Sequence, residues 1–135
     1  MLKLLYQTMR ALINDKIPNR LIRYIYELKA ICINGEAPQV FQCVVCGDTE
    51  RPGQFSTLKG GKVCTRCMQD VYDGLELDPS TWYTLQYIES AKVEHLYNFT
   101  VSDQVLRELA MVMGRYMDVY VDHQFKSLEI LKLMT

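Results

Sequence analysis

The stretch CVVCGDTERPGQFSTLKGGKVCTRC, residues 43–67, decides the fold of this chain. It begins with the pair Cys43 and Cys46 and ends with the pair Cys64 and Cys67, so that 17 residues separate the two pairs. This spacing is typical of a structural zinc site, in which two tight turns aim four thiolates at one tetrahedral ion. We therefore predict one structural Zn²⁺ per chain, bound by these four cysteines.

Other chemistry is compatible with two Cys-x-x-Cys pairs. The same sulfurs could bind rubredoxin-type iron or an iron–sulfur cluster, or they could form redox-active dithiols or disulfides. Four sulfur ligands leave no open coordination position, so a zinc ion bound in this way stabilises the fold and does not activate water. The fifth cysteine, Cys32, lies on an apolar helix stripe and is predicted to be a small buried side chain.

Helical periodicity precedes the cysteine segment. Apolar residues recur at helical spacing over residues 2–14, and the predicted stripe contains Leu2, Leu5, Met9, Leu12 and Ile13. A second helix is predicted over residues 20–34, with Asn19 as its N-cap and Gly35 as its C-terminal stop. Its stripe contains Leu21, Ile25, Leu28 and Cys32, with Ile22 and Ile31 beside it.

Helical periodicity also follows the cysteine segment, weakly over residues 68–75 and more clearly after Pro79. Ser80 or Thr81 is predicted to cap a helix that contains Trp82, Leu85 and Ile88. Ser102 is predicted to cap a long helix from about 103 to 123.

The intervening segment holds most of the glycines and prolines, with short β pieces at residues 40–42 and 62–63. It has too few apolar residues to form a core without a metal. The predicted fold class is therefore mainly α. Residues 1–135 form a single helical domain, with a small four-cysteine zinc-finger insert at about 36–70 that contains short β pieces.

Composition and motifs exclude several classes of protein. The chain has 135 residues, of which 49% are hydrophobic and 23% are charged, which is typical of one globular domain. No apolar run is long enough to span a membrane and no secretory signal is present, which predicts a cytoplasmic protein without membrane contact. Nucleotide-binding glycine motifs and the HExxH motif are absent, so we expect no enzyme, no catalytic residues and no small-molecule substrate.

The charge is unevenly distributed, although the net charge is only −1. Residues 1–23 carry five basic side chains and one acidic side chain, whereas residues 68–103 carry seven acidic side chains and one basic side chain. The basic segment is a candidate phosphate-binding surface and the acidic segment is expected to repel phosphate. The candidate DNA contacts are Arg10, Lys16, Arg20, Arg23, Lys59, Lys62 and Arg66. The alternative is that these side chains only solubilise the surface.

Several motifs follow one another along the chain. They are the helix from Arg20 that ends in Gly35-x-Ala-Pro38, the segments Cys43-x-x-Cys46-Gly47, Phe55-Ser56 and Gly60-Gly61-x-x-Cys64-x-x-Cys67, the helix that begins at Ser102-Asp103, the pair Arg115-Tyr116 and the terminal Phe125-Lys-Ser-Leu128. In order and content, these motifs resemble the C-terminal part of the RecO family of bacterial DNA repair proteins. The resemblance covers nearly the whole chain. The N-terminal OB-fold domain of the family has no counterpart in this sequence.

The resemblance implies a recombination mediator of the RecFOR pathway in the bacterial cytoplasm, associated with the nucleoid. Such a protein binds single- and double-stranded DNA, anneals complementary strands, and assists RecA loading together with RecR and the single-stranded DNA-binding protein. It also implies that Cys43, Cys46, Cys64 and Cys67 are zinc ligands. The alternatives are a zinc-ribbon adaptor that binds only proteins and a thiol redox centre.

Overall fold

The computed structural model describes residues 2–14 and 16–134, with side chains for these residues except 70 and 121–134. Its α-helices are α1 (Leu2–Asn14), α2 (Asn19–Ile33), α3 (Pro79–Ser90) and α4 (Asp103–Met134). Its strands are β1 (Gly53–Ser56), β2 (Gly61–Cys64) and β3 (Leu75–Glu76), and its short 3-10 helices are η1 (Thr65–Asp70) and η2 (Val93–His95). The prediction of a mainly α fold with a small β-containing insert is confirmed.

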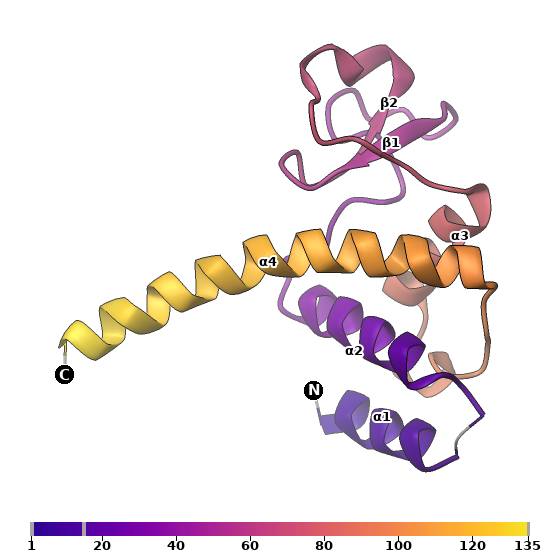
Figure 1. Ribbon diagram of the computed structural model, residues 1–135, viewed down its shortest axis with the longest axis vertical. Coiled ribbons are helices and arrows are strands. Elements are labelled where there is room, and N and C mark those ends of the chain that lie inside the picture. The colour runs from indigo at the N-terminus through magenta and orange to yellow at the C-terminus, as the bar shows by residue number, and fades with distance from the viewer. Residues whose placement is uncertain (1, 15, 135) are drawn as a thin grey trace.

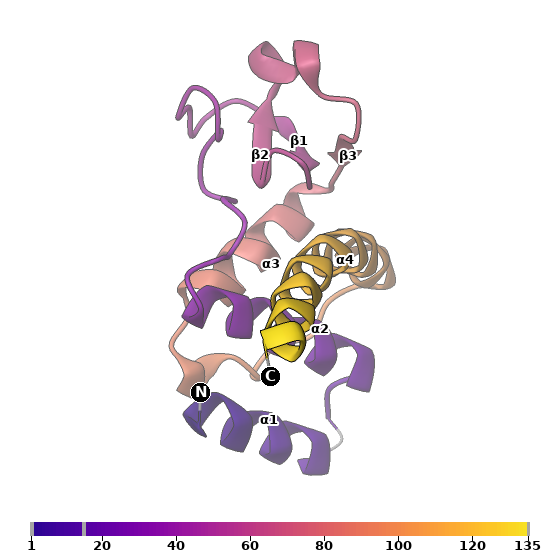
Figure 2. The ribbon, with the colours of Figure 1, turned by 90° about the vertical axis from the view of Figure 1, so that its left-hand side faces the viewer.

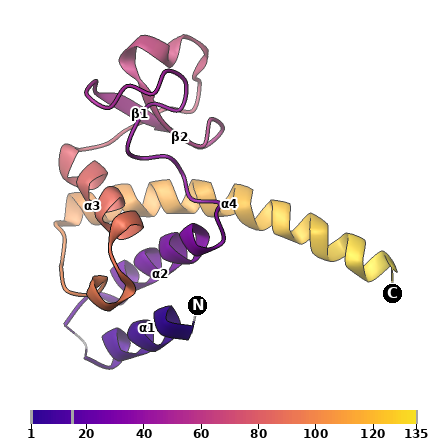
Figure 3. The same ribbon diagram turned by 180° about the vertical axis from the view of Figure 1, so that it is seen from behind.

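Helix α2 lies at the centre of the helical part, where it contacts α1, α3 and α4. The sheet and η1 lie at the opposite end of the molecule from α1, and α4 crosses between them and extends beyond the rest of the structure (Figure 1). A view from behind shows α3 between the sheet and the lower helices (Figure 3). The insert is therefore attached to the bundle mainly on the side of α3 and α4.

The predicted apolar stripe of α2 is confirmed by burial. Leu21, Ile22, Ile25 and Leu28 are almost fully buried, whereas Cys32 is half-buried. The predicted stop is also confirmed, because Gly35 has φ of +77° and donates its N–H to the Cys32 carbonyl at 3.0 Å. The next N–H, of Glu36, reaches the Ile31 carbonyl at 3.0 Å, which completes a Schellman motif. The predicted N-cap was wrong, because Pro18 is the N-cap and Asn19 is the first helical residue.

Helix α1 buries the face opposite to the predicted stripe. Leu4, Thr8 and Ala11 are buried, and the Thr8 hydroxyl donates to the Leu4 carbonyl at 2.7 Å and also contacts the Tyr97 hydroxyl. The predicted stripe is exposed instead, with exposed fractions that range from 46% for Leu5 to 84% for Leu2. Both faces of α1 are apolar, and the buried face, which includes the small residues Thr8 and Ala11, is the one covered by the rest of the fold. The periodicity therefore predicted the helix correctly but selected the wrong packing face.

The three strands form an antiparallel sheet in the order β2-β1-β3 (Figure 2). In the register of β1 and β2, Gly53 is opposite Cys64 and Phe55 is opposite Lys62. The predicted β piece at 62–63 lies in β2, but residues 40–42 are not a strand. Instead Gln39 forms an isolated parallel bridge with Gly61, where a side chain would meet the Gln39 carbonyl oxygen at 2.2 Å.

The chain between the sheet and α4 differs from its predicted form. Residues 68–75 contain the end of the 3-10 helix η1 and the start of β3 instead of an α-helix. Asp78 caps α3, because its side chain accepts the Ser80 N–H at 2.9 Å, and Pro79 occupies the first turn. Neither Ser80 nor Thr81 is the N-cap. The predicted cap of α4 is confirmed, since the Ser102 hydroxyl accepts the Val105 N–H at 3.3 Å.

Helix α4 is longer than predicted, because it continues to Met134. Val105, Leu109 and Val112, which recur at helical spacing, are buried, whereas Val119 is 53% exposed. The side chains of Phe125 and Leu128, which contributed to the family resemblance, lie outside the described side chains. Of the helices in residues 2–14 and 16–134, none has the length and hydropathy needed to cross a membrane.

Candidate metal centre

A tight turn presents the first cysteine pair. The Gly47 N–H donates to the Cys43 carbonyl at 2.9 Å, and Gly47 has φ of +78°, which glycine adopts without steric cost. The Cys43 N–H donates to the Asp48 carbonyl at 2.9 Å and closes the turn from the other side. The turn that brings Cys43 and Cys46 together therefore favours glycine at position 47, because the backbone has a positive φ there.

Strand β2 and the 3-10 helix η1 present the second pair. Cys64 is the last residue of β2, and Cys67 follows in the first turn of η1. The Val44 N–H donates to the Lys62 carbonyl at 2.9 Å, which joins the first turn to β2. Two segments that are distant in sequence are thus fixed against each other by backbone hydrogen bonds.

The four thiols converge on one point. The Sγ atoms of Cys43, Cys46, Cys64 and Cys67 all lie within 4.8 Å of one another, and those of Cys46 and Cys64 are 3.6 Å apart. Sulfurs at the corners of a tetrahedron with metal–sulfur bonds of about 2.3 Å are about 3.8 Å apart, so the observed spacing fits one ion. All five cysteines of the chain are free thiols. The cluster could therefore hold a metal ion.

Backbone N–H groups favour a thiolate at Cys43. The N–H groups of Val45 and Cys64 each donate to Cys43 Sγ at 3.4 Å. Burial raises the pKa of the Cys43 thiol, but hydrogen bonds from the N–H groups of Cys64, Cys46 and Val45 outweigh burial and lower this pKa to about 6. One sulfur of the cluster is thus prepared to bind a cation near neutral pH.

The opposite shift occurs at Cys67. Desolvation and hydrogen bonds with the thiols of Cys64, Cys46 and Cys43 raise the pKa of Cys67 to about 12. Close sulfurs share protons because four neighbouring thiolates would repel one another. A divalent cation removes that repulsion, so metal binding is expected to release the remaining protons.

The candidate DNA contacts form two separate groups. The N-terminal basic group consists of Arg10, Lys16, Arg20 and Arg23, which are exposed on α1, the following connector and the start of α2. The finger basic group consists of Lys59, Lys62 and Arg66, which lie between β1 and the middle of η1. The elements that carry the two groups lie at opposite ends of the molecule (Figure 1). The structure therefore does not bring the seven residues together.

Three of these basic side chains already have partners. The Arg10 Cζ atom lies 5.8 Å from the ring centroid of Tyr6, on the same helix. The Arg23 Nε atom lies 2.8 Å from Glu27 Oε1, and the hydrogen bond with Glu27 raises the pKa of Arg23. The Lys62 Nζ atom lies 5.5 Å from the ring centroid of Trp82, on α3. Arg10, Arg23 and Lys62 therefore have contacts within the fold that the sequence did not reveal.

Some acidic side chains of residues 68–103 have roles within the fold, and the predicted repulsion of phosphate by this segment stays a prediction. The Asp73 carboxylate accepts from the Ser56 hydroxyl at 2.7 Å, and Asp78 caps α3. Glu89 is half-buried near Lys29, and burial raises the pKa of Glu89 to about 8. Sequence reasoning missed the roles of Asp73 and Glu89 because their surroundings form only in the tertiary fold, whereas the Asp78 cap is a local contact with the Ser80 N–H.

Residues 1–129 match the protein family described as Recombination protein O C terminal. The chain belongs to the RecO family. The DNA repair protein RecO of Acetivibrio thermocellus is 31% identical to it over 121 residues, which are 89% of this chain and 48% of that protein. RecO of Thermoanaerobacter sp. is 32% identical over 102 residues, which are 76% of this chain and 41% of that protein. RecO of Bacillus pumilus is 29% identical over 132 residues, which are 98% of this chain and 51% of that protein.

The chain thus spans about half the length of the curated RecO relatives it matches. No solved structure matches it. Membership in the RecO family supports a role in DNA repair and recombination, which agrees with the resemblance found in the motifs.

Proposed function

We propose that this chain is the DNA- and partner-binding part of a recombination mediator. In this function it binds single- and double-stranded DNA, promotes annealing, and assists RecA loading together with RecR and the single-stranded DNA-binding protein. It acts by binding and not by catalysis, in the bacterial cytoplasm near the nucleoid. The observation that carries the proposal is the family match over residues 1–129. We also propose that residues 1–135 are one domain, with the cysteine-bearing segment as its insert.

Zinc is the metal that the cluster is proposed to bind. Four sulfur donors within 4.8 Å of one another suit a soft or borderline cation and disfavour Mg²⁺ or Ca²⁺. Zinc has no redox chemistry and takes four thiolates in a closed site, so it would hold the turn at Cys43 against β2 and η1. Its role would be structural, one ion per chain, with Cys43, Cys46, Cys64 and Cys67 as ligands.

The metal proposal is tested by substitution of one proposed ligand. Cys64→Ser is expected to abolish stoichiometric zinc in the purified 135-residue chain and to lower its thermal stability. Cys32→Ser is the matched control, because Cys32 is a half-buried thiol on α2 outside the cluster. Four thiols that react with a thiol reagent only after chelation support a structural metal. Rapid reaction of these thiols in the metal-loaded protein would instead favour the redox alternative.

DNA binding is proposed to depend on the two basic groups. Each basic side chain that neutralises a phosphate releases counterions, so the affinity for DNA should fall with added salt. Arg20→Ala in the N-terminal basic group and Lys59→Ala in the finger basic group are each expected to weaken binding at low salt. Each contact that is lost should reduce the slope of log affinity against log salt by about 1.

The measurement is fluorescence anisotropy of a labelled oligonucleotide titrated with the chain at two salt concentrations. Lys92→Ala is the matched control, because Lys92 is an exposed lysine outside both basic groups. If Lys92→Ala weakens DNA binding as much as Arg20→Ala and Lys59→Ala do, Arg20 and Lys59 are not specific DNA contacts and the proposed interface is wrong. Absence of DNA binding even at low salt would favour the adaptor that binds only proteins.

A further inference from the structure

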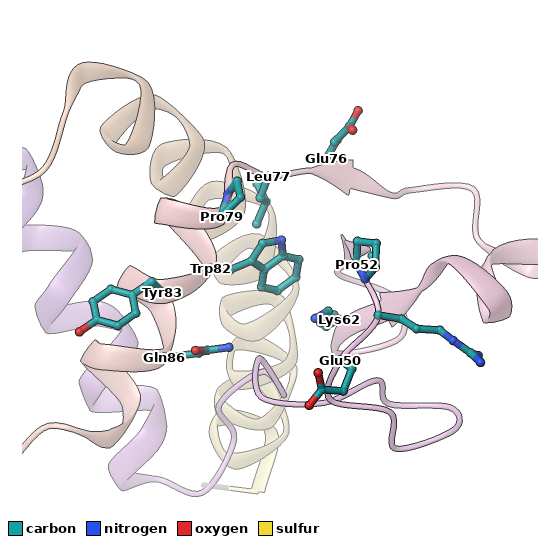
Figure 4. A pocket seen from close by; sticks show the side chains of 11 residues that line it. Glu50, Pro52, Lys62, Glu76, Leu77, Pro79, Trp82, Tyr83 and Gln86 are labelled. Carbon is teal, nitrogen blue, oxygen red and sulfur yellow. The ribbon is translucent and has the colours of Figure 1, made fainter.

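A cavity of about 390 Å³ lies where the hairpin of β1 and β2 meets α3. Its volume is in the range of sites for small organic ligands. The hairpin side contributes Glu50, Arg51, Pro52, Gly53 and Lys62, and the helical side contributes Trp82, Tyr83 and Gln86, with Glu76, Leu77 and Pro79 between them. Figure 4 shows Trp82 projecting from α3 towards the hairpin, while Tyr83 points away from it. An aromatic side chain therefore forms one wall of the cavity.

Trp82 packs against a buried aromatic ring and keeps part of its own ring accessible. Its ring centroid lies 6.3 Å from that of the fully buried Phe55, at an interplanar angle of 43°. Gln86, one turn further along α3, donates its side-chain amide to the Val40 carbonyl at 3.0 Å. Trp82 is still only half-buried, and the Lys62 ammonium lies 5.5 Å from its ring centroid. The indole is thus fixed from behind and accessible from the cavity.

The charges of the cavity suit a neutral ring better than a phosphate. The positive charges of Arg51 and Lys62 are balanced by the negative charges of Glu50 and Glu76, so the net charge of these four groups is zero. The two cations are half-buried, whereas both carboxylates are exposed, and Glu76 points away from Trp82 in Figure 4. The Arg51 Nε atom lies 3.6 Å from Asp48 Oδ2, so the guanidinium is already paired. The cavity therefore offers a nucleobase mainly the face of the Trp82 indole.

We propose that this cavity binds one unpaired nucleobase of single-stranded DNA, stacked on the indole of Trp82. The inference rests on the proposed function, which supplies DNA as the ligand. A base in a duplex already has neighbours on both faces, so only an unpaired base can use this surface. The flexible Lys62 side chain then moves off the ring and lies beside the phosphate of the same nucleotide. Lys62 is also the member of the finger basic group that contacts α3.

The metal centre supports one wall of the cavity. Gly53 is opposite the ligand candidate Cys64 in the sheet, and the Thr65 N–H donates to the Pro52 carbonyl at 3.0 Å. Loss of the metal should therefore disturb the wall that faces Trp82, and chelation should weaken stacking of the base.

Trp82 is the only tryptophan of the chain, so its emission reports directly on the cavity. The 135-residue chain is titrated at low salt with an unstructured oligonucleotide and with a duplex of the same length. Anisotropy of a labelled oligonucleotide measures total binding in parallel. The single strand is expected to quench Trp82 emission on binding, and the duplex is expected to bind with little change in emission.

Variants test the stacking contact separately. Trp82→Leu should weaken single-strand binding about tenfold and leave duplex binding unchanged, whereas Trp82→Phe should retain most of the affinity. Tyr72→Leu is the matched control, because Tyr72 is an aromatic side chain with 93% exposure outside the cavity. If Trp82→Leu does not fold, quenching in the unmodified chain still decides the question.

Each outcome has a separate meaning. Single-strand binding without quenching, or equal quenching by single strand and duplex, would overturn the base site and leave the proposed function standing. Quenching by a proline-rich peptide but not by a single strand would assign the cavity to a protein partner and overturn the inference. Absence of binding to any DNA would overturn both proposals. The anisotropy measurement detects this outcome because it reports total binding independently of Trp82 emission.

Discussion

Phe55 joins the cysteine-bearing insert to the helical bundle, so its replacement by alanine is the sharpest test of the fold. It lies on β1 with no exposed surface, and its ring centroid is 6.3 Å from that of Trp82 on α3 and 6.4 Å from that of Tyr116 on α4. Removal of a buried phenylalanine ring costs about 3–5 kcal/mol, of which each aromatic contact contributes about 0.5–1.5 kcal/mol. The free energy of unfolding of such a domain is about 5–15 kcal/mol, so Phe55→Ala should remove a large fraction of its stability.

The assay is equilibrium urea unfolding in the presence of saturating zinc. Trp82 emission follows the region around Phe55, and far-UV circular dichroism follows the helices. Phe41→Ala is the matched control, since Phe41 is 43% exposed and its loss should cost less than about 1 kcal/mol. If Phe55→Ala lowers the free energy of unfolding no more than Phe41→Ala does, Phe55 does not anchor the insert and the packing described above is wrong.

Three further predictions concern stability and zinc retention. Glu108→Ala should lower the free energy of unfolding by about 1–3 kcal/mol in urea melts, because the buried Thr81 hydroxyl, 2.9 Å from Glu108, loses its acceptor, and Glu108→Gln should cost less. Burial raises the pKa of Glu89 from 4.5 to about 8, so the folded chain retains a proton that the unfolded chain loses. Stability should therefore fall as pH rises between these values, and a Glu89→Gln melt series that keeps the same slope would contradict this assignment. Gly53→Ala should weaken zinc retention in a chelator competition, because its Cβ would meet the Val63 carbonyl oxygen at 2.2 Å, and unchanged retention would show that the hairpin can adjust.

The sequence alone was sufficient for features that depend on local spacing. Two Cys-x-x-Cys pairs predict a four-sulfur cluster because each pair needs only one tight turn, and the cysteines do converge. Gly35 ends α2 because the left-handed conformation of the Schellman motif favours glycine wherever the helix packs. These features require few distant contacts, so the residues nearby in sequence carry the necessary information.

Tertiary structure alone decided which surfaces meet. Periodicity showed that α1 has an apolar face, but it could not show that the fold would bury Leu4, Thr8 and Ala11 and leave Leu5 exposed. Likewise, Trp82 fits an ordinary helix stripe until the hairpin places Lys62 over its ring. A helical pattern gives the direction of each side chain about its own axis, whereas the neighbour on each side depends on contacts between segments far apart in the chain.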